Sequence, residues 1–255
     1  LWRIIRGLMD TAFVIGNGES RPIFPIDNLK GQGVIYGCNA IYRDHPMLCD
    51  HIVAVNPPMY EELAKWHNNG KESPKIYGPE DISRWNYICE GDQEQDVPHG
   101  LKIYRIWRGG DIKKMNKVRT IDFSMSRGSG MSAVLMAAES GIQNVVILAF
   151  DILGARQWEM DSPSRQQNNM YKNTINYPDR MSMKAYLKYE WMFQLRQIVR
   201  KHPGTNFYFI NRKEYIEGNT FLRWYFDQPN IRTGIYADLR RWIEGQRDDI
   251  KWMKL

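Results

Sequence analysis

Glycine, serine and arginine follow a short apolar run near the start of the chain, as in a phosphate-binding loop. The run Ala12–Ile15 continues directly into the sequence GNGESR. Glycines let backbone amides approach an anion closely, and an arginine binds phosphate oxygens in a bidentate manner. An ordinary tight turn is the alternative, because neither a Walker sequence nor a complete G-x-G-x-x-G is present. The residues of this loop that we expect to bind a ligand phosphate are Gly16, Asn17, Gly18, Ser20 and Arg21.

Comparable polar residues end three other apolar runs. Asn39 and Asn56 follow runs rich in valine and isoleucine, and Asp151 follows the run NVVILAF. An amide suits a base edge or a ribose, and a carboxylate suits a sugar hydroxyl or general-base chemistry. Each of these residues would equally fit a turn or a cap. Taken together at the ends of several predicted strands, they favour a phosphorylated ligand, most simply a nucleotide.

A predicted helix begins at the sequence SRGSGMSA. Arg127, Ser129 and Gly130 then lie at the positive end of the helix dipole, where backbone amides, a hydroxyl and a guanidinium favour an anion. Plain N-capping by Ser129 is compatible with the same sequence. We expect Arg127, Ser129 and Gly130 to contribute to the nucleotide site.

The order of predicted elements indicates an α/β protein. Continuous apolar runs alternate with amphipathic segments, which is the pattern of a single Rossmann-like, doubly wound, mostly parallel sheet with helices on both faces. The predicted strands are 12–15, 33–39, 50–56, 144–151 and 206–211, with further strands expected near 74–78 and 101–108. The predicted helices are 57–67, 129–141, 181–202 and 234–246.

The chain length suits one large domain. We expect residues 1–8 to be a dispensable, non-native extension ahead of the first strand. We expect 9–212 to form the nucleotide-binding domain and 213–255 to form a C-terminal helical closure. A long polar stretch, 154–180, reads as a lid-like loop that closes over the ligand.

Composition narrows the class of protein. The formal net charge is +6, and 43% of the residues are hydrophobic, which is enough for a core. No apolar run is long enough to span a membrane, and three scattered cysteines argue for a reducing compartment. We expect a basic cytoplasmic protein, in the host cytoplasm if a phage encodes it, with an oligomeric state that the sequence leaves open.

The segment 101–119 combines lysines and arginines with aromatic residues. Such a mixture binds an acidic glycan or DNA, although a solvated basic surface has the same composition. The residues that we expect to contact an acceptor are Arg105, Trp107, Arg108, Lys113 and Lys114.

Three ordered motifs carry a family resemblance. FVIGNGESR, YGCNAIY and SRGSGMSAVLMAAESGIQNVVILAFD together resemble the family 42 sialyltransferases. They are also similar to the motility-accessory-factor family, which includes archaeal pterin diphosphokinases, and to uncharacterised phage proteins. The resemblance implies a Rossmann-like glycosyltransferase of the GT-A-variant type, which uses a CMP-activated sugar as co-substrate with no metal and no cofactor. It also implies that Asn17 and Asn39 contact the nucleotide, and that Ser129 and Gly130 contact the donor.

The chain departs from that family at several positions. Glu19 stands where the family has proline, and the region that holds the family's catalytic histidine contains none here. The residues that we expect to replace it are Asp179, Tyr171 or Tyr177. We expect Asp179 or Asp151 to take the proton of the acceptor hydroxyl, and Tyr171 and Tyr177 to donate to the leaving group. Two alternatives stay open. One is a pterin-type diphosphokinase that uses ATP and Mg²⁺, with Asp27 and Asp151 as metal ligands, and the other is a non-catalytic nucleotide-fold accessory protein.

Overall fold

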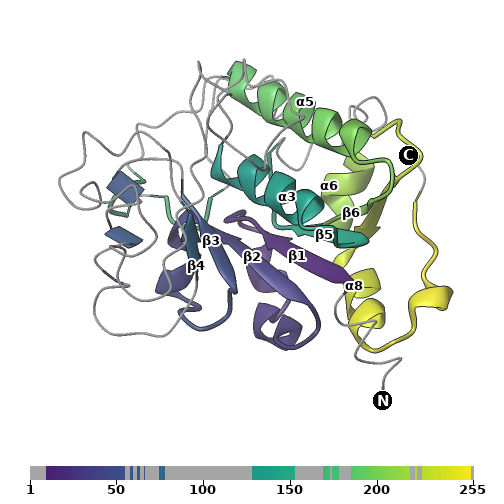
Figure 1. The fold of residues 1–255 in the computed structure, drawn as a ribbon, viewed down its shortest axis with the longest axis horizontal. Helices are drawn as coiled ribbons and strands as arrows, with labels where there is room; N and C mark the ends of the chain where they lie inside the picture. The colour runs from purple at the N-terminus through teal and green to yellow at the C-terminus, as the bar shows by residue number, and fades with distance from the viewer. Residues whose placement is uncertain are drawn as a thin grey trace.

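A parallel sheet forms the centre of the molecule, as seen in a computed structural model of the chain (Figure 1). The structure describes residues 10–54, 58–59, 62–63, 66, 75–77, 128–152, 169–172, 174–177, 185–218, 222 and 226–253. Seven strands pair in the order β4-β3-β2-β1-β5-β6-β7, and every neighbouring pair is parallel. They are β1 (Thr11–Ile15), β2 (Val34–Cys38), β3 (His51–Val53), β4 (Lys75–Tyr77), β5 (Asn144–Leu148), β6 (Asn206–Asn211) and β7 (Ile231–Ile235).

The central strand β1 is apolar on both faces. Ala12 and Val14 pack into one core cluster, and Phe13 and Ile15 pack into the other. A strand with helices or turns on both sides buries all its side chains, which explains the continuous apolar run. In register, Ala12 lies beside Val34 of β2 and Val145 of β5.

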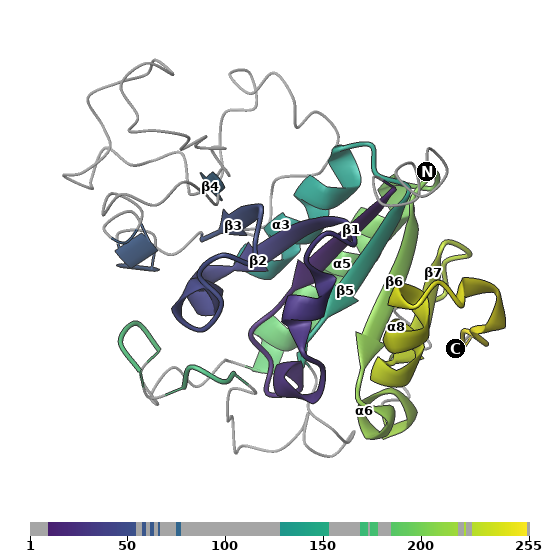
Figure 2. The same cartoon turned by 90° about the horizontal axis from the view of Figure 1, so that it is seen from below.

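Helices cover one face of the sheet, and a helix with short 3-10 turns covers the other (Figures 1 and 2). On the first face lie α3 (Ser129–Glu139), α5 (Ala185–Lys201) and α6 (Lys213–Gly218). On the second lie α8 (Tyr236–Ile243) and the turns η1 (Arg21–Ile23), η2 (Ile26–Leu29) and η3 (Asn39–Arg43). A further turn, η5 (Arg247–Asp249), precedes the C-terminal segment.

The chain order reverses between β1 and β5. Strands β2, β3 and β4 extend the sheet in one direction from β1, and β5, β6 and β7 extend it in the other. Crossovers between parallel strands share one hand, so the two halves carry their connections on opposite faces. The connections diverge at this switch point and leave room there, which makes it the place where open α/β sheets bind ligands.

The predicted α/β class with a parallel sheet is confirmed. The five predicted strands and the expected strand near 74–78 are present, and the expected strand near 101–108 lies outside the described residues. Strand β7 is absent from the sequence prediction, and its last two residues fall within the predicted helix 234–246, which instead begins at Tyr236. Among the described helices, none is both long and apolar enough to cross a membrane.

Candidate functional site

The loop after β1 lies against the end of β5. The Gly16 amide donates to the Leu148 carbonyl at 2.8 Å, and the Gly18 amide donates to the Ala149 carbonyl at 2.9 Å. A Cβ on Gly18 would lie 2.5 Å from that Ala149 oxygen and 2.6 Å from Cγ of Asp151. These glycines are therefore required by the close approach of two chain segments. Their amides already have acceptors, so a phosphate here would be bound by other donors.

Asp151 ties the loop to three other strand ends. Its Oδ2 accepts the Ser20 amide at 2.7 Å, and its Oδ1 accepts the Ser20 hydroxyl at 2.6 Å and the Asn211 side chain at 2.9 Å. The Ser20 hydroxyl also lies 2.9 Å from the hydroxyl of Tyr236, whose pKa is raised by burial. The Asp151 carboxylate is fully buried. It links the end of β5 directly to the loop after β1 and to the end of β6, and through Ser20 to the start of α8.

Ala149, just before Asp151, has a φ of 56° although it carries a Cβ. The left-handed region costs a residue of this kind about 1–2 kcal/mol. Ala149 is buried, and its carbonyl accepts the Gly18 amide. Strain of this kind tends to persist at functional sites because the surrounding contacts hold it in place.

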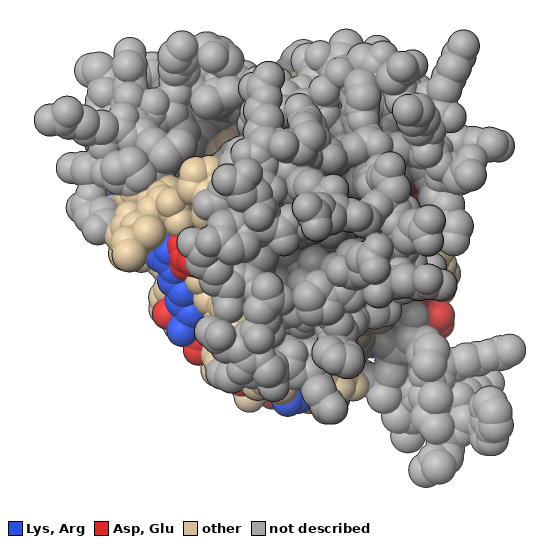
Figure 3. All heavy atoms as spheres, turned by 60° about the vertical axis from the view of Figure 1, so that its left-hand side comes forward, with Lys and Arg blue, Asp and Glu red and all other residues tan. Residues whose placement is uncertain are grey.

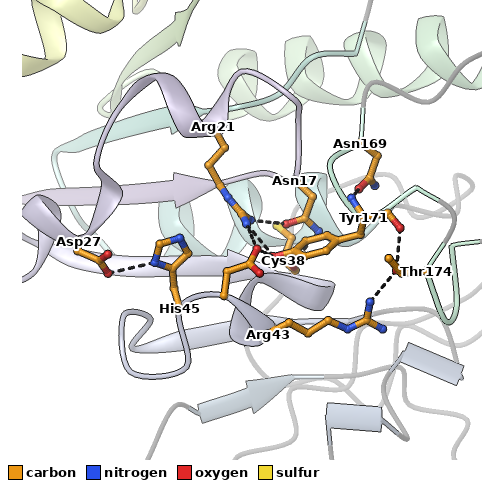
Figure 4. A network of polar contacts seen from close by, with 10 residues as sticks. Asn17, Arg21, Asp27, Cys38, Arg43, His45, Asn169, Tyr171 and Thr174 are labelled. Carbon is orange, nitrogen blue, oxygen red and sulfur yellow. Dashed lines mark hydrogen bonds and ion pairs between the residues drawn. The ribbon is translucent and has the colours of Figure 1, made fainter.

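Arg21 is 2% exposed and organises a polar cluster beneath the loop (Figure 4). Its Nη1 donates to Oδ1 of Asn17 at 3.1 Å, and its Nη2 donates to Oδ2 of Asp44 and to the Tyr171 hydroxyl, both at 2.7 Å. The Asn17 amide in turn donates to the carbonyl of Cys38 at 3.0 Å. These three hydrogen bonds hold the guanidinium in place, and it fixes the orientation of Asn17 at the boundary between β1 and β2.

Arg43 organises a second cluster next to the first. Its guanidinium pairs with both carboxylate oxygens of Glu62, at 2.7 and 2.6 Å, and donates to the Thr174 hydroxyl at 2.8 Å. Tyr42 and Asn176 also donate to Glu62. Burial acts to raise the Glu62 pKa, but these hydrogen bonds outweigh it and hold the pKa below its usual range. The cluster joins η3 to residues 174–177.

The segment 169–177 covers the loop after β1. Asn169 pairs with Gly18 in an antiparallel bridge, and the Met170 amide donates to the Asn17 carbonyl at 2.9 Å. Lys172 forms an ion pair with Glu19 at 2.6 Å, and the Glu19 side chain is 37% exposed. Glu19, the acid that replaces the family's proline, is thus turned outward and neutralised by the covering segment.

Asn39 and Ser129 meet at the switch point, although they come from distant parts of the sequence. The Ser129 hydroxyl, at the start of α3, donates to Oδ1 of Asn39 at 2.7 Å. Asn39 has a φ of 50°, a left-handed conformation that asparagine tolerates better than most residues. A Cβ on the neighbouring Gly130 would lie 2.8 Å from the Phe150 ring, so that position needs glycine for packing.

Two tyrosines predicted to act in catalysis belong to the covering segment, and both are buried. The Tyr171 hydroxyl donates to Asp44 at 2.7 Å in addition to its contact with Arg21, and burial raises its pKa. Tyr177 packs against Tyr171 with ring centroids 5.9 Å apart, and burial raises its pKa as well. The Tyr177 hydroxyl is buried and has no hydrogen-bond partner among the described residues.

Several predicted site residues lie outside the described residues: Asn56, Arg127 and Asp179 of the donor and catalytic sets, and Arg105, Trp107, Arg108, Lys113 and Lys114 of the acceptor set. On the face drawn in Figure 3, the described charges that are visible alternate in sign along one margin.

Asp27 is a metal ligand in the diphosphokinase alternative, and its Oδ1 lies 3.1 Å from Nδ1 of His45. The described residues include no group of three or more His, Cys, Asp or Glu placed to hold a metal ion.

The structure adds residues that the sequence does not single out. Asp44, Arg43 and Glu62 support the loops, and Tyr236 and Arg212 border Asp151. Their roles depend on partners far along the chain, which the sequence does not reveal. The one local signal is the pair of charged residues Arg43 and Asp44, which follow a predicted strand closely in the sequence YRD.

Comparison with known proteins finds no matching family model, no matching curated protein and no matching solved structure. The resemblance to the family 42 sialyltransferases stays a prediction that depends on its three motifs.

Proposed function

We propose that the chain binds a nucleotide at the switch point between β1 and β5. The observation that carries the proposal is the contact between Asn39 and Ser129, which joins the carboxyl end of β2 to the start of α3. Because Oδ1 of Asn39 accepts from Ser129, its amide nitrogen is the group left to donate to a base or a ribose. Asn17 lies at the same edge and is oriented by Arg21; of the two hydrogens on its amide nitrogen, one is donated to the Cys38 carbonyl.

The start of α3 supplies the chemistry for the phosphate. The helix has eleven residues, so its first turn carries backbone amides and the positive end of a full dipole. Ser129 adds a hydroxyl there. A nucleoside bound at Asn39 would place its phosphate within reach of these donors, and the motif resemblance favours cytidine as the base.

We further propose that the bound nucleotide is the donor half of a nucleotide sugar. In the transfer, the acceptor hydroxyl oxygen forms a bond to the anomeric carbon while the bond from that carbon to the phosphate oxygen breaks. The electron pair leaves with the nucleotide, and Asp179 takes the proton of the acceptor hydroxyl. Amides and the hydroxyl at the start of α3 stabilise the charge that develops on the phosphate. No metal takes part in this scheme.

The segment 154–180 contains the covering residues 169–177, which matches the closure that the transfer requires. Exclusion of water protects an activated sugar from hydrolysis. The covering residues are attached to the loops after β1 and β2 through Arg21 and Arg43. The acceptor is a glycan or DNA that the basic segment 101–119 would bind.

A specific observation favours a second candidate, a nucleotide-binding protein without catalysis. Asp151 and the Tyr171 hydroxyl, two of the predicted catalytic groups, are already engaged in hydrogen bonds within the protein. Both candidates require the same nucleotide site, and they differ only in whether a sugar is transferred.

Thermal unfolding with a panel of ligands tests the proposal. CMP, UMP, GDP, ATP and CMP-activated sugars are each added with and without Mg²⁺. We expect CMP compounds to raise the melting temperature without Mg²⁺, because a ligand at about 100 times its Kd adds roughly 2.7 kcal/mol to the free energy of unfolding. A panel that leaves the melting temperature unchanged refutes the nucleotide site. Release of CMP that depends on an acceptor then separates the transferase from the non-catalytic candidate.

A further inference from the structure

A third arginine lies at the carboxyl edge of the sheet, and its contacts differ from those of Arg21 and Arg43. Those two guanidiniums each donate to a carboxylate at 2.7 Å or less. Arg212 follows β6 directly, and its Nη2 lies 3.9 Å from Oδ2 of Asp151. That separation exceeds the length of a hydrogen bond.

The Nε atom of Arg212 is also without a partner. It is buried, and no described residue accepts a hydrogen bond from it. A buried donor without an acceptor destabilises the protein. Because Nε is buried, an anion from solution would meet the two Nη atoms of the guanidinium.

Asp151 does not supply the missing acceptor, because closer donors occupy it. Both of its oxygens accept from Ser20, at 2.7 and 2.6 Å, and one also accepts from Asn211 at 2.9 Å. Asp151 therefore forms a long ion pair with Arg212, at 3.9 Å, while its shorter hydrogen bonds go to other groups. Among the residues that the structure describes, none accepts a hydrogen bond from Nε of Arg212.

The backbone that carries Arg212 is held firmly. Its amide donates to Oδ1 of Asn211 at 2.7 Å, and the Asn211 side chain is bonded to Asp151. The Arg212 side chain is 28% exposed, so a solute can reach part of it although its Nε is buried. A cation on a fixed backbone, at the edge where α/β sheets bind ligands, is suited to bind an anionic group with little reorganisation.

We propose that Arg212 binds a phosphate or carboxylate group of a ligand that lies across the ends of β5 and β6. The planar guanidinium donates two parallel hydrogen bonds to two oxygens of the anion. This site does not depend on the proposed nucleotide site, since β6 is two strands away from β1 in the sheet. It adds an anion subsite on the other side of Asp151.

Titration calorimetry with inorganic phosphate and with acetate tests the proposal on the full chain. We expect at least one of these anions to bind the wild-type protein, and Arg212→Gln to weaken that binding by about ten- to a hundredfold. Arg212→Lys keeps the charge but loses the planar guanidinium, so its affinity for the anion should lie between those of the wild type and Arg212→Gln. Dependence on Arg212 for phosphate only, or for acetate only, identifies which chemical group the site takes.

Arg240→Gln is the matched control, because Arg240 is exposed on α8 and its loss changes the net charge equally. The control should bind the anion as the wild type does. The proposal is overturned if neither anion binds the wild type, or if Arg212→Gln and Arg240→Gln weaken binding equally. It is also overturned if Arg212→Gln lowers the melting temperature but leaves the anion affinity unchanged. Asn39→Gly separates the two proposals, since it should weaken nucleotide binding about tenfold and leave the anion affinity unchanged.

Discussion

Replacing Asp151 by asparagine tests whether this carboxylate holds the strand ends together. Asparagine has nearly the same shape, but one acceptor oxygen becomes an amide nitrogen. The carboxylate accepts from three donors, at 2.7, 2.6 and 2.9 Å. Whichever way the new amide is turned, at least one of these donors faces another donor.

The expected loss follows from one charge-assisted hydrogen bond in a buried site. Such a bond contributes about 1.5–3 kcal/mol. For a domain of this size each 1 kcal/mol lowers the melting temperature by roughly 2–4 °C. Asp151→Asn should therefore lower the melting temperature by about 3–12 °C, as measured by calorimetry or by circular dichroism.

Asp227→Asn provides the comparison. Asp227 is paired with Arg196 at 2.7 Å, but its side chain is 44% exposed. An exposed ion pair contributes about 0–1 kcal/mol, so this variant should unfold close to the wild type. If Asp151→Asn is as stable as Asp227→Asn and only activity is lost, then Asp151 acts as a catalytic base and the structural role assigned to it here is wrong.

Three further predictions concern packing and titration. Gly18→Ala should lower the free energy of unfolding in urea by about 1–3 kcal/mol, because its Cβ would lie 2.5 Å from the Ala149 carbonyl oxygen. Gly204→Ala is the control, since a Cβ there has open space around it and should not destabilise the protein. The pKa of Glu62 is below 4.5, so the folded state binds that proton more weakly than the unfolded state. The Glu62 carboxylate therefore stabilises the protein fully above pH 4.5, and this stabilisation is lost as the pH falls through the lowered pKa. Glu62→Gln should remove this contribution to the loss of stability in acid. A variant whose free energy of unfolding depends on pH as in the wild type would contradict the prediction. Burial, with Lys201 nearby, lowers the pKa of His202 below 6.5, so stability from its neutral form is lost as the pH falls below 6.5, and an NMR titration that gives a higher pKa would refute this.

Much of the fold could be predicted because parallel strands leave a local signal. Runs such as VVIL in β5 are apolar at consecutive positions, which is typical of a strand buried on both faces. Strand β7, with the sequence IRTGI, lacks that signal because it is partly exposed at the sheet edge. Its Gly234 packs against Trp252, where a Cβ would lie 2.7 Å from the ring, and that contact is invisible in the local sequence.

The candidate site was only partly predictable, because tertiary contacts leave no signal in the local sequence. The ends of apolar runs correctly indicate which residues gather at the carboxyl edge, among them Asn39 and Ser129. What each residue contacts depends on the tertiary structure. Gly16 and Gly18 fit a phosphate loop by composition, yet their amides donate to the end of β5, a partner more than a hundred residues away in the chain.

Binding of CMP to the wild type and to Asn39→Gly is the most direct test of the proposed nucleotide site. Glycine keeps the left-handed conformation at φ 50° while removing the amide that would donate to the nucleotide. We predict that calorimetry gives one CMP bound per wild-type chain, with an affinity about tenfold weaker in Asn39→Gly, as one hydrogen bond implies. Equal affinity in the two proteins, or no binding to the wild type, would contradict a nucleotide site at the switch point.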